Sequence, residues 1–464
     1  MAQKNSDGTG KALLFRALKH QPTDKVPWVP FAGVHAGKLV GYSAQEVLTD
    51  GDKLMEALLA VQRTYDPDGQ PVVFDLQIEA EILGCDLLWA EKAPPTVASH
   101  PLASDMTVPD HLPAPDEGRL PMVLDVMRRM KSEVGATTAL YGLVTGPLTL
   151  ASHLRGTELF MDVFDQPAFL DELIAYARDV AQRMAELYID AGMDVIAVVD
   201  PLVSQISPRH FTKLLAEAYT DIFAAIRAQG VFSAFFVCGD ATKNIEAMCQ
   251  TAPDSISIDE NIDLAPAKVM TDRYNITMGG NIPLTTHMLL GNQQDNMKFV
   301  VDLLDRIDVI EGESQNFILA PGCDMPYDVP VENVVGTVQA VRDPQGTRAM
   351  LANYQAESLD LSAVVLPDYE HLDRPLVEVF TLDSDTCAAC GYMRDAALRA
   401  TQELGEQVQM VEYKFTEREN VARVVKMGVK NLPSIYINGQ LKYSSLIPSN
   451  RELVEEIKHH LSEE

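Results

Sequence analysis

Residues 194–238, DVIAVVDPLVSQISPRHFTKLLAEAYTDIFAAIRAQGVFSAFFVC, decide the fold of the first part of this 464-residue chain. Two short apolar runs, Asp194–Val199 and Phe232–Cys238, flank a segment with helical periodicity, Pro208–Ala228. Both runs are apolar throughout rather than at alternate positions, which is typical of strands buried on both faces of a parallel sheet. The stretch therefore predicts a β-α-β unit.

The alternation of apolar runs with helical segments continues toward both ends of this stretch. A helical segment, Lys11–Lys19, leads into it, and a longer one spans Asp162–Ala191. Eight apolar runs over roughly 330 residues predict an α/β fold of the (β/α)8 TIM-barrel type, with Ala93–Glu117 as an insertion. The predicted strands are Val26–Phe31, Val72–Asp75, Ala139–Val144, Asp194–Val199, Phe232–Cys238, Ser255–Asp259, Ile276–Gly279 and Phe317–Ala320.

The alternation of apolar runs with helical segments stops after Ala340, which marks the end of the predicted barrel. We predict a barrel domain over residues 1–341, a linker over 342–375 and a small α/β domain over 376–464. The linker combines turn residues with mixed propensity. The small domain has predicted strands Val377–Thr381, Val408–Tyr413, Ser434–Ile437 and Lys442–Ser445, and helices Cys390–Leu404, Glu417–Met427 and Asn450–Leu461.

Charge and composition exclude several classes of partner. The chain has 37 Lys and Arg against 67 Asp and Glu, a formal net charge of −30. Such a balance disfavours binding to nucleic acid or to anionic membranes, because both require clustered cations. The N-terminus has no apolar core, no window approaches the length of a membrane span, and six cysteines do not make a disulfide scaffold. We expect a cytoplasmic protein.

Polar residues follow the predicted strands, where the active sites of barrels lie. Cys238 and Cys323 each end a strand, and two thiolates facing one pocket could contribute to a zinc site. Alternatively, each is a small buried hydrophobe, and an Asp that ends a strand is a helix cap. Cys85 and Cys249 have no such context and are predicted core residues. The candidate substrate-binding residues are His35, Asp75, His153, Asp200 and Asn281.

Several motifs in the first 340 residues resemble one known family. VPFAGVHAGKLVG (29–41), VTGPLTLASHLRG (144–156) and LAPGCDMPYDVPVENV (319–334) are similar to the uroporphyrinogen decarboxylase superfamily, in its methylcobamide:coenzyme M methyltransferase-like branch. The resemblance implies a (β/α)8 barrel that moves a methyl group between a corrinoid protein and a thiol. It also implies a zinc ion, held by a His-x-Cys pair and a distant Cys, that activates the thiol.

The implied zinc ligands are only partly present. Cys238 matches the Cys of the pair and Cys323 the distant Cys, but Phe236 stands in place of the His. The metal ligands that we predict are Cys238, Cys323, Asp240 and Glu260, with His153 or His35 as other substitutes for the missing donor. The decarboxylase branch matches less well, because the stretch PWVPFAGVHAGK lacks the arginines that bind substrate carboxylates there, and His153 replaces a Tyr.

The C-terminal domain carries a second motif, Thr386-Cys387-Ala388-Ala389-Cys390, at a strand-to-helix junction. A helix N-terminus lowers the pKa of the first thiol, and the second can resolve a mixed disulfide, so Cys387 and Cys390 are candidate catalytic residues. Pro433 precedes a later strand and resembles the cis-proline loop of thioredoxin and glutaredoxin-like domains. Half of a zinc knuckle, or a fold without activity, is the alternative.

Taken together, the sequence predicts a corrinoid-linked methyltransferase with a fused thioredoxin-like domain. The methyl group would move between a corrinoid, free or bound to a protein, and a thiol or a small methylated substrate. Two alternatives stay open: a metal-poor, non-catalytic partner of a corrinoid protein, and a decarboxylase of a small acid.

Overall fold

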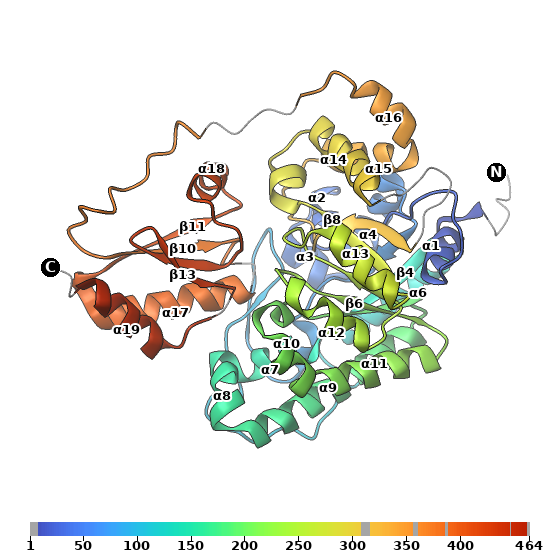
Figure 1. Ribbon diagram of the computed structural model, residues 1–464. Helices are drawn as coiled ribbons and strands as arrows, with labels where there is room; N and C mark the ends of the chain where they lie inside the picture. Colours follow the sequence, from blue (N-terminus) through green and yellow to red (C-terminus); the bar gives the residue numbers. More distant parts are fainter. Residues whose placement is uncertain (1–7, 308–315, 356–360, 386–387, 446, 462–464) are drawn as a thin grey trace. The chain divides into compact units, whose positions relative to one another are not determined.

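The computed structural model describes residues 8–307, 316–355, 361–385, 388–445 and 447–461. These residues form two compact units (Figure 1). The first consists of residues up to Val203 and from Ser207 to Tyr354, and the second of the residues from Gln355 onward, with Ser204–Ile206 grouped with it. Within the described ranges, no helix is both long enough and apolar enough to cross a membrane.

The first unit is built on a parallel sheet with the strand order β1-β4-β5-β6-β7-β8-β9. The segment around Trp28 closes this sheet into a ring, because Trp28 forms a parallel bridge with Leu319 of β9 and its carbonyl oxygen accepts a hydrogen bond from Asp68, next to β1. The predicted barrel is therefore confirmed. Its strands are β1 Gly69–Pro71, β4 Ala139–Thr145, β5 Val195–Val199, β6 Phe232–Phe236, β7 Ser255–Ser257, β8 Thr277–Ile282 and β9 Phe317–Pro321.

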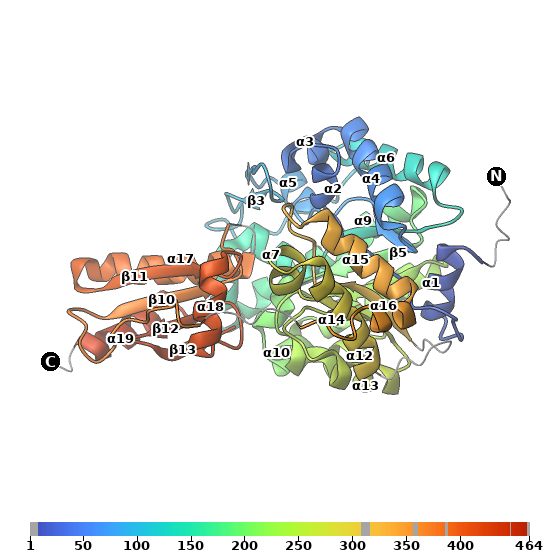
Figure 2. The ribbon, with the colours of Figure 1, turned by 90° about the horizontal axis from the view of Figure 1, so that it is seen from above.

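Helices surround this sheet on the outside (Figures 1 and 2). A buried cluster that includes Tyr141 and Phe236 of the strands and Val29 of the closing segment forms the core of this unit. The helices are α1 Gly10–Leu18, α2 His35–Lys38, α3 Ala44–Thr49, α4 Gly51–Tyr65, α5 Ile78–Ile82, α6 Leu120–Glu133, α7 Pro147–Arg155, α8 Leu159–Asp165, α9 Pro167–Asp190, α10 Pro208–Leu214, α11 Ala216–Ala228, α12 Ile245–Gln250, α13 Leu264–Arg273, α14 Gln293–Arg306, α15 Val331–Arg342 and α16 Pro344–Met350.

Several predictions of element boundaries were wrong. The predicted strand Val26–Phe31 is not a regular strand and pairs through the bridge at Trp28, and the predicted helix Pro208–Ala228 is two helices, α10 and α11. The second predicted strand, Val72–Asp75, lies three residues too late, because β1 is Gly69–Pro71, in register with Ala139–Tyr141 of β4. The predicted helix Asp162–Ala191 is two helices, since Pro167 has no N–H to continue α8 and instead opens α9.

The second unit is a four-stranded sheet with the order β11-β10-β12-β13. β10 (Leu376–Thr381) pairs in parallel with β11 (Gln409–Lys414) and antiparallel with β12 (Ser434–Ile437), which pairs with β13 (Gln440–Ser444). Helices α17 (Ala388–Leu404) and α19 (Asn450–Leu461) cover one face, and α18 (Arg418–Met427) covers the other (Figure 1). The predicted small α/β domain is confirmed.

Two stretches outside the regular pattern differ in detail from the sequence-based expectations. The predicted linker, 342–375, contains helix α16. The predicted insertion, Ala93–Glu117, carries one short strand, β3 (Thr96–Val97), which pairs antiparallel with β2 (Leu87–Leu88) before α6 begins.

Candidate functional site

Two cysteines meet at the carboxyl-terminal mouth of the barrel. Cys238 lies two residues after β6 and Cys323 two residues after β9, and the two form a disulfide with a Cα–Cα distance of 5.9 Å. Their strands are separated in the sheet by β7 and β8, so the bond crosses the mouth. Both side chains are partly exposed. The barrel topology thus brings together the two sulfurs that the sequence singled out.

Glycines allow both cysteine loops to take their positions. Gly239 has a φ of +82°, in the left-handed region that favours glycine. Gly322 packs so closely that a Cβ atom there would lie 2.6 Å from the backbone nitrogen of Glu260. A larger residue would therefore strain the backbone at position 239 and displace the Glu260 loop at position 322.

Carboxyl groups surround the cysteine pair. Nearby backbone N–H groups favour the ionised forms of two of them: Gly239 lowers the pKa of Asp259, and Leu284 and Thr285 lower that of Glu260. Burial, and then the charge of Asp259, raise the pKa of Glu260 to about 8, although its side chain keeps some exposure. Glu260 is therefore mostly protonated at neutral pH.

Asp324, directly after Cys323, is a further carboxyl at the mouth. It accepts a hydrogen bond of 2.7 Å from the backbone of Gly33, and burial raises its pKa well above the ordinary value. Asp324 was not among the predicted site residues, although its position directly after Cys323 was a signal for it.

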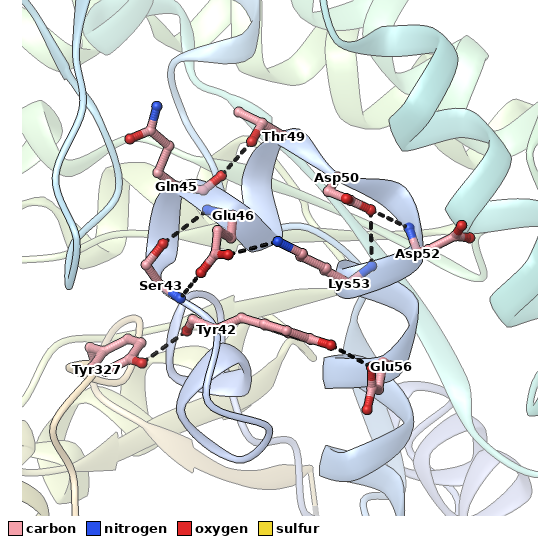
Figure 3. Close-up of polar contacts among 10 residues, drawn as sticks. All are labelled: Tyr42, Ser43, Gln45, Glu46, Thr49, Asp50, Asp52, Lys53, Glu56 and Tyr327. Atoms are coloured by element: carbon pink, nitrogen blue, oxygen red, sulfur yellow. Dashed lines mark hydrogen bonds and ion pairs between the residues drawn. The ribbon is translucent and has the colours of Figure 1, made fainter.

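The loop after Cys323 is held in place by its own tyrosine (Figure 3). The Tyr327 hydroxyl donates to the backbone oxygen of Tyr42 (2.8 Å), and the Tyr42 hydroxyl donates to Glu56 of α4. Next to it, Glu46 completes a capping box at the start of α3 and pairs with Lys53 of α4 at 2.6 Å. The Cys323 loop is therefore tied to two capped helices.

His35 is buried and contacts the loop after Cys323. Its Nδ1 lies 3.0 Å from the Tyr327 carbonyl oxygen, which can only accept, so Nδ1 donates and Nε2 accepts from the Tyr65 hydroxyl at 2.7 Å. Burial lowers the pKa of His35 to about 4, so the ring is neutral. Both ring nitrogens are used within the protein.

Asp75 forms a buried ion pair that local sequence did not reveal. One carboxylate oxygen accepts from Arg119 Nη1 at 2.5 Å, and Arg119 also donates to Glu81 at 2.6 Å. The Arg119 guanidinium lies over the ring of Trp89. Arg119 lies 44 residues after Asp75 in the sequence, just before α6. No motif in the surrounding sequence indicated that the two residues pair.

Asp200 lies at the end of β5 and acts as the cap of another helix. Its carboxylate accepts from the backbone N–H groups of Leu148 (2.9 Å) and Thr149 (3.1 Å) in the first turn of α7, and from the hydroxyls of Thr149 and Tyr219. Its side chain is fully buried. These four contacts occupy the carboxylate.

His153 and Asn281 complete the set of predicted substrate contacts. His153 lies in α7, where burial lowers its pKa to about 3, and its buried Nδ1 has no hydrogen-bond partner. Asn281, in β8, donates to the backbone oxygens of Asp259 (2.9 Å) and Ile262 (2.8 Å). Asn281 thereby fixes the loop that carries Glu260.

The donor set at the mouth does not fit a tetrahedral zinc ion. Both cysteine sulfurs are bonded to each other, and Phe236 is fully buried against Phe31, with ring centroids 4.7 Å apart. Asp240 accepts hydrogen bonds from Thr242 instead. Among the residues that the structure describes, no three His, Cys, Asp or Glu side chains converge as metal ligands do.

In the second unit, the structure describes only one cysteine of the Cys-x-x-Cys motif. Cys390 lies in the first turn of α17, is buried, and its sulfur accepts a hydrogen bond from the Leu382 backbone at 3.4 Å. Cys387 lies outside the described residues. The Leu432–Pro433 peptide bond is cis, as in the loop that the sequence resembled.

Known proteins match both units. A family model described as uroporphyrinogen decarboxylase (URO-D) matches residues 9–344, and a thioredoxin domain model matches residues 376–458. The methylcobamide:CoM methyltransferase MtbA of Methanosarcina acetivorans is 26% identical over 344 residues, covering 72% of this chain and 98% of the relative. MtaA of Methanosarcina barkeri is also 26% identical, with the same coverage.

A relative from the decarboxylase branch and a solved structure also match the first unit. The uroporphyrinogen decarboxylase of Nostoc punctiforme is 25% identical over 292 residues, covering 61% of this chain and 80% of the relative. The solved structure of a methyltransferase from Methanosarcina mazei shares the barrel fold, with a TM-score of 0.66 and 24% identity over 72% of this chain and 98% of that one. The resemblance seen in the sequence is confirmed.

Proposed function

Since the chain belongs to the uroporphyrinogen decarboxylase (URO-D) family, we propose that its barrel is a methyltransferase. It moves a methyl group between a corrinoid, free or protein-bound, and a thiol or a small methylated substrate. The observation that carries this proposal is the pair of sulfurs at the barrel mouth, in a chain that matches methylcobamide:CoM methyltransferases over 98% of their length. We place the protein in the cytoplasm.

The chemistry of the transfer suits the groups around the pair. A thiol that accepts a methyl group provides the electron pair of the new S–C bond and must lose its proton. Glu260, with a pKa of about 8, is matched to a thiol, whose ordinary pKa is near 8.5, and can take up that proton in its ionised form. Asn281 positions the loop that carries Glu260.

The cysteine pair belongs to this reaction only when it is reduced. A sulfur in a disulfide has no proton to lose and no thiolate form, whereas reduction gives the mouth two thiols. Because Phe236 removes a nitrogen donor and the described side chains do not converge as ligands, no step of the proposed reaction is assigned to zinc.

Decarboxylation of a substrate rich in carboxylates fits the mouth less well. Arg119, beside Asp75, is already paired with two carboxylates of the protein. The groups next to the cysteines are Asp259, Glu260 and Asp324, and none of these carboxyls supplies the positive charge that binds an anionic substrate.

The C-terminal domain, in this proposal, handles thiol redox chemistry. Cys390 is buried in the first turn of α17, as a resolving thiol would be. Cys387, which lies outside the described residues, is the proposed nucleophile on the basis of the sequence motif alone.

The experiment is to follow methylcobalamin spectroscopically while the fully reduced protein is mixed with candidate thiols, coenzyme M among them. We expect demethylation that depends on the thiol and is lost in Cys238→Ser and Cys323→Ser, but kept in the matched control Cys249→Ser. Two results would overturn the proposal: tight binding of a corrinoid protein without methyl transfer, which indicates a non-catalytic partner, or release of CO2 from a small acid.

A further inference from the structure

Residues 361–373, in the predicted linker, form an irregular segment of the second unit that precedes β10. We infer that this segment, the strap, is latched to the second unit by Tyr369 and Glu378, and that the latch sets the length of free chain between the two units. The inference is independent of the proposed methyl transfer and thiol chemistry, because it uses none of the residues assigned to them.

A buried carboxyl in β10 holds the strap. Glu378 is fully buried, and the alternation along β10 places it on the same face of the sheet as Phe380, the face that α18 covers. The Tyr369 hydroxyl donates to both carboxylate oxygens of Glu378, at 2.9 and 3.0 Å. A buried charge without a hydrogen bond is costly, so the strap supplies a donor that the folded sheet needs.

The ring of Tyr369 is fitted to its position as closely as the hydroxyl. A Cβ atom at Gly439, in the turn between β12 and β13, would lie 2.7 Å from this ring. On the other side, the hydroxyl lies 3.6 Å from the sulfur of Met427, at the end of α18. Tyr369 is therefore enclosed by two elements of the second unit.

The first residues of the strap are held through their carbonyl groups by α18. Lys426 donates to the backbone oxygens of Leu361 (3.1 Å) and Val364 (2.6 Å), and Arg423 donates to that of Val365 (3.2 Å). These contacts are exposed, so water competes for them and each contributes little. The strap therefore depends mainly on the buried contact between Tyr369 and Glu378.

The latch changes the length of chain that connects the units. The first unit ends at Tyr354, whose hydroxyl lies 2.9 Å from Asp295 of α14. With the strap in place, six residues (355–360) separate Tyr354 from Leu361, a reach of about 25 Å for a fully extended chain. With the strap released, 21 residues (355–375) separate Tyr354 from β10, a reach of about 80 Å. The latch thereby sets the effective concentration of one unit at the other.

The first test is limited chymotrypsin digestion of the full chain, in which the cleavage rate within the strap reports the fraction of open strap. Tyr369→Phe keeps the ring and the cleavage site but removes the hydroxyl. We expect cleavage after Leu366, Leu372 and position 369 to become on the order of tenfold faster, the factor for losing one hydrogen bond to a charged group. Tyr274→Phe is the matched control, because it removes an exposed hydroxyl that bonds to Glu246 in the first unit.

The second test measures the length of the connection. Tyr369→Glu brings a second carboxylate to Glu378 and should release the strap outright. Small-angle X-ray scattering of the full chain should then give a larger maximum dimension than for the wild type. His371→Glu adds the same charge to an exposed residue of the strap, and should leave the maximum dimension unchanged.

Two results would overturn the inference. One is a Tyr369→Phe chain whose strap is cut at the wild-type rate, and the other is a rapidly cut strap in Tyr369→Glu without any increase in maximum dimension. If circular dichroism shows that neither variant folds, Lys426→Ala tests the other end of the strap. It should accelerate cleavage relative to Lys430→Ala, and equal rates in the two lysine variants would count against the strap. None of these readouts measures methyl transfer.

Discussion

Replacing Asp200 by Ala should destabilise the barrel strongly without changing how it binds a thiol. The carboxylate accepts four hydrogen bonds from Leu148, Thr149 and Tyr219, all in a fully buried position. Each buried donor left without an acceptor costs about 1–3 kcal/mol, and since water can enter the vacated space, we expect a total of about 3–5 kcal/mol. Asp200→Asn keeps the volume but turns an NH2 group toward donors, and should cost about 2 kcal/mol.

Tryptophan fluorescence during urea unfolding measures this loss for the barrel alone. Both tryptophans of the chain, Trp28 and Trp89, lie in the first unit, so the C-terminal domain does not contribute to the signal. Asp240→Ala is the matched control: Asp240 also follows a strand, but it is partly exposed and its carboxylate accepts from Thr242 only. We expect the control to cost less than about 1 kcal/mol.

An Asp200→Ala variant that unfolds like the wild type and instead has a raised KM for the thiol would contradict this role of Asp200. Asp200 would then be the substrate contact that the sequence predicted, and its role as a helix cap would be secondary.

Three further predictions concern titration, thiols and domain boundaries. Because burial raises the pKa of Glu260 to about 8 from an ordinary 4.5, the folded barrel holds a proton that the unfolded chain has lost between these values, so stability falls as pH rises through that window. Glu260→Gln should remove up to about 1.4 kcal/mol per pH unit of this slope in urea unfolding at pH 5.5 and 7.5, and an unchanged slope would contradict the assignment. Brief iodoacetamide labelling of the reduced protein at pH 7 should mark Cys387 first and leave Cys85 and Cys249 unmodified, whereas early labelling of either would contradict their burial. Limited proteolysis should cut within residues 342–375 and leave a stable C-terminal fragment of about 90 residues, and a first cut inside the barrel would contradict that boundary.

The sequence was sufficient for the barrel because most of its strands are continuous apolar runs. β4, β5 and β6 begin within a residue of their predicted positions. β1 was misplaced because Gly69, Gln70 and Pro71 carry no strand signal of their own, and their conformation comes from pairing with β4. Such tertiary pairing is not visible in a local pattern.

Only those contacts of the candidate site that the barrel topology itself determines could be predicted from the sequence. Cys238 and Cys323 meet because both follow strands of one barrel. The roles of Asp200 and His35 depend on partners such as Tyr219 and Tyr65, and neither pairing follows from sequence spacing. The pairing of Asp75 with Arg119 could not be predicted for the same reason, since 44 residues separate them.

In the proposed function, methyl transfer at the barrel mouth requires the reduced Cys238–Cys323 pair. The most direct measurement is the rate of methylcobalamin demethylation by the full-length protein in a series of thiol–disulfide buffers, with the redox state of the pair determined in the same samples by mass spectrometry. We expect a rate of demethylation that is proportional to the reduced fraction of the pair. A rate that stays constant as the pair passes from dithiol to disulfide would contradict it.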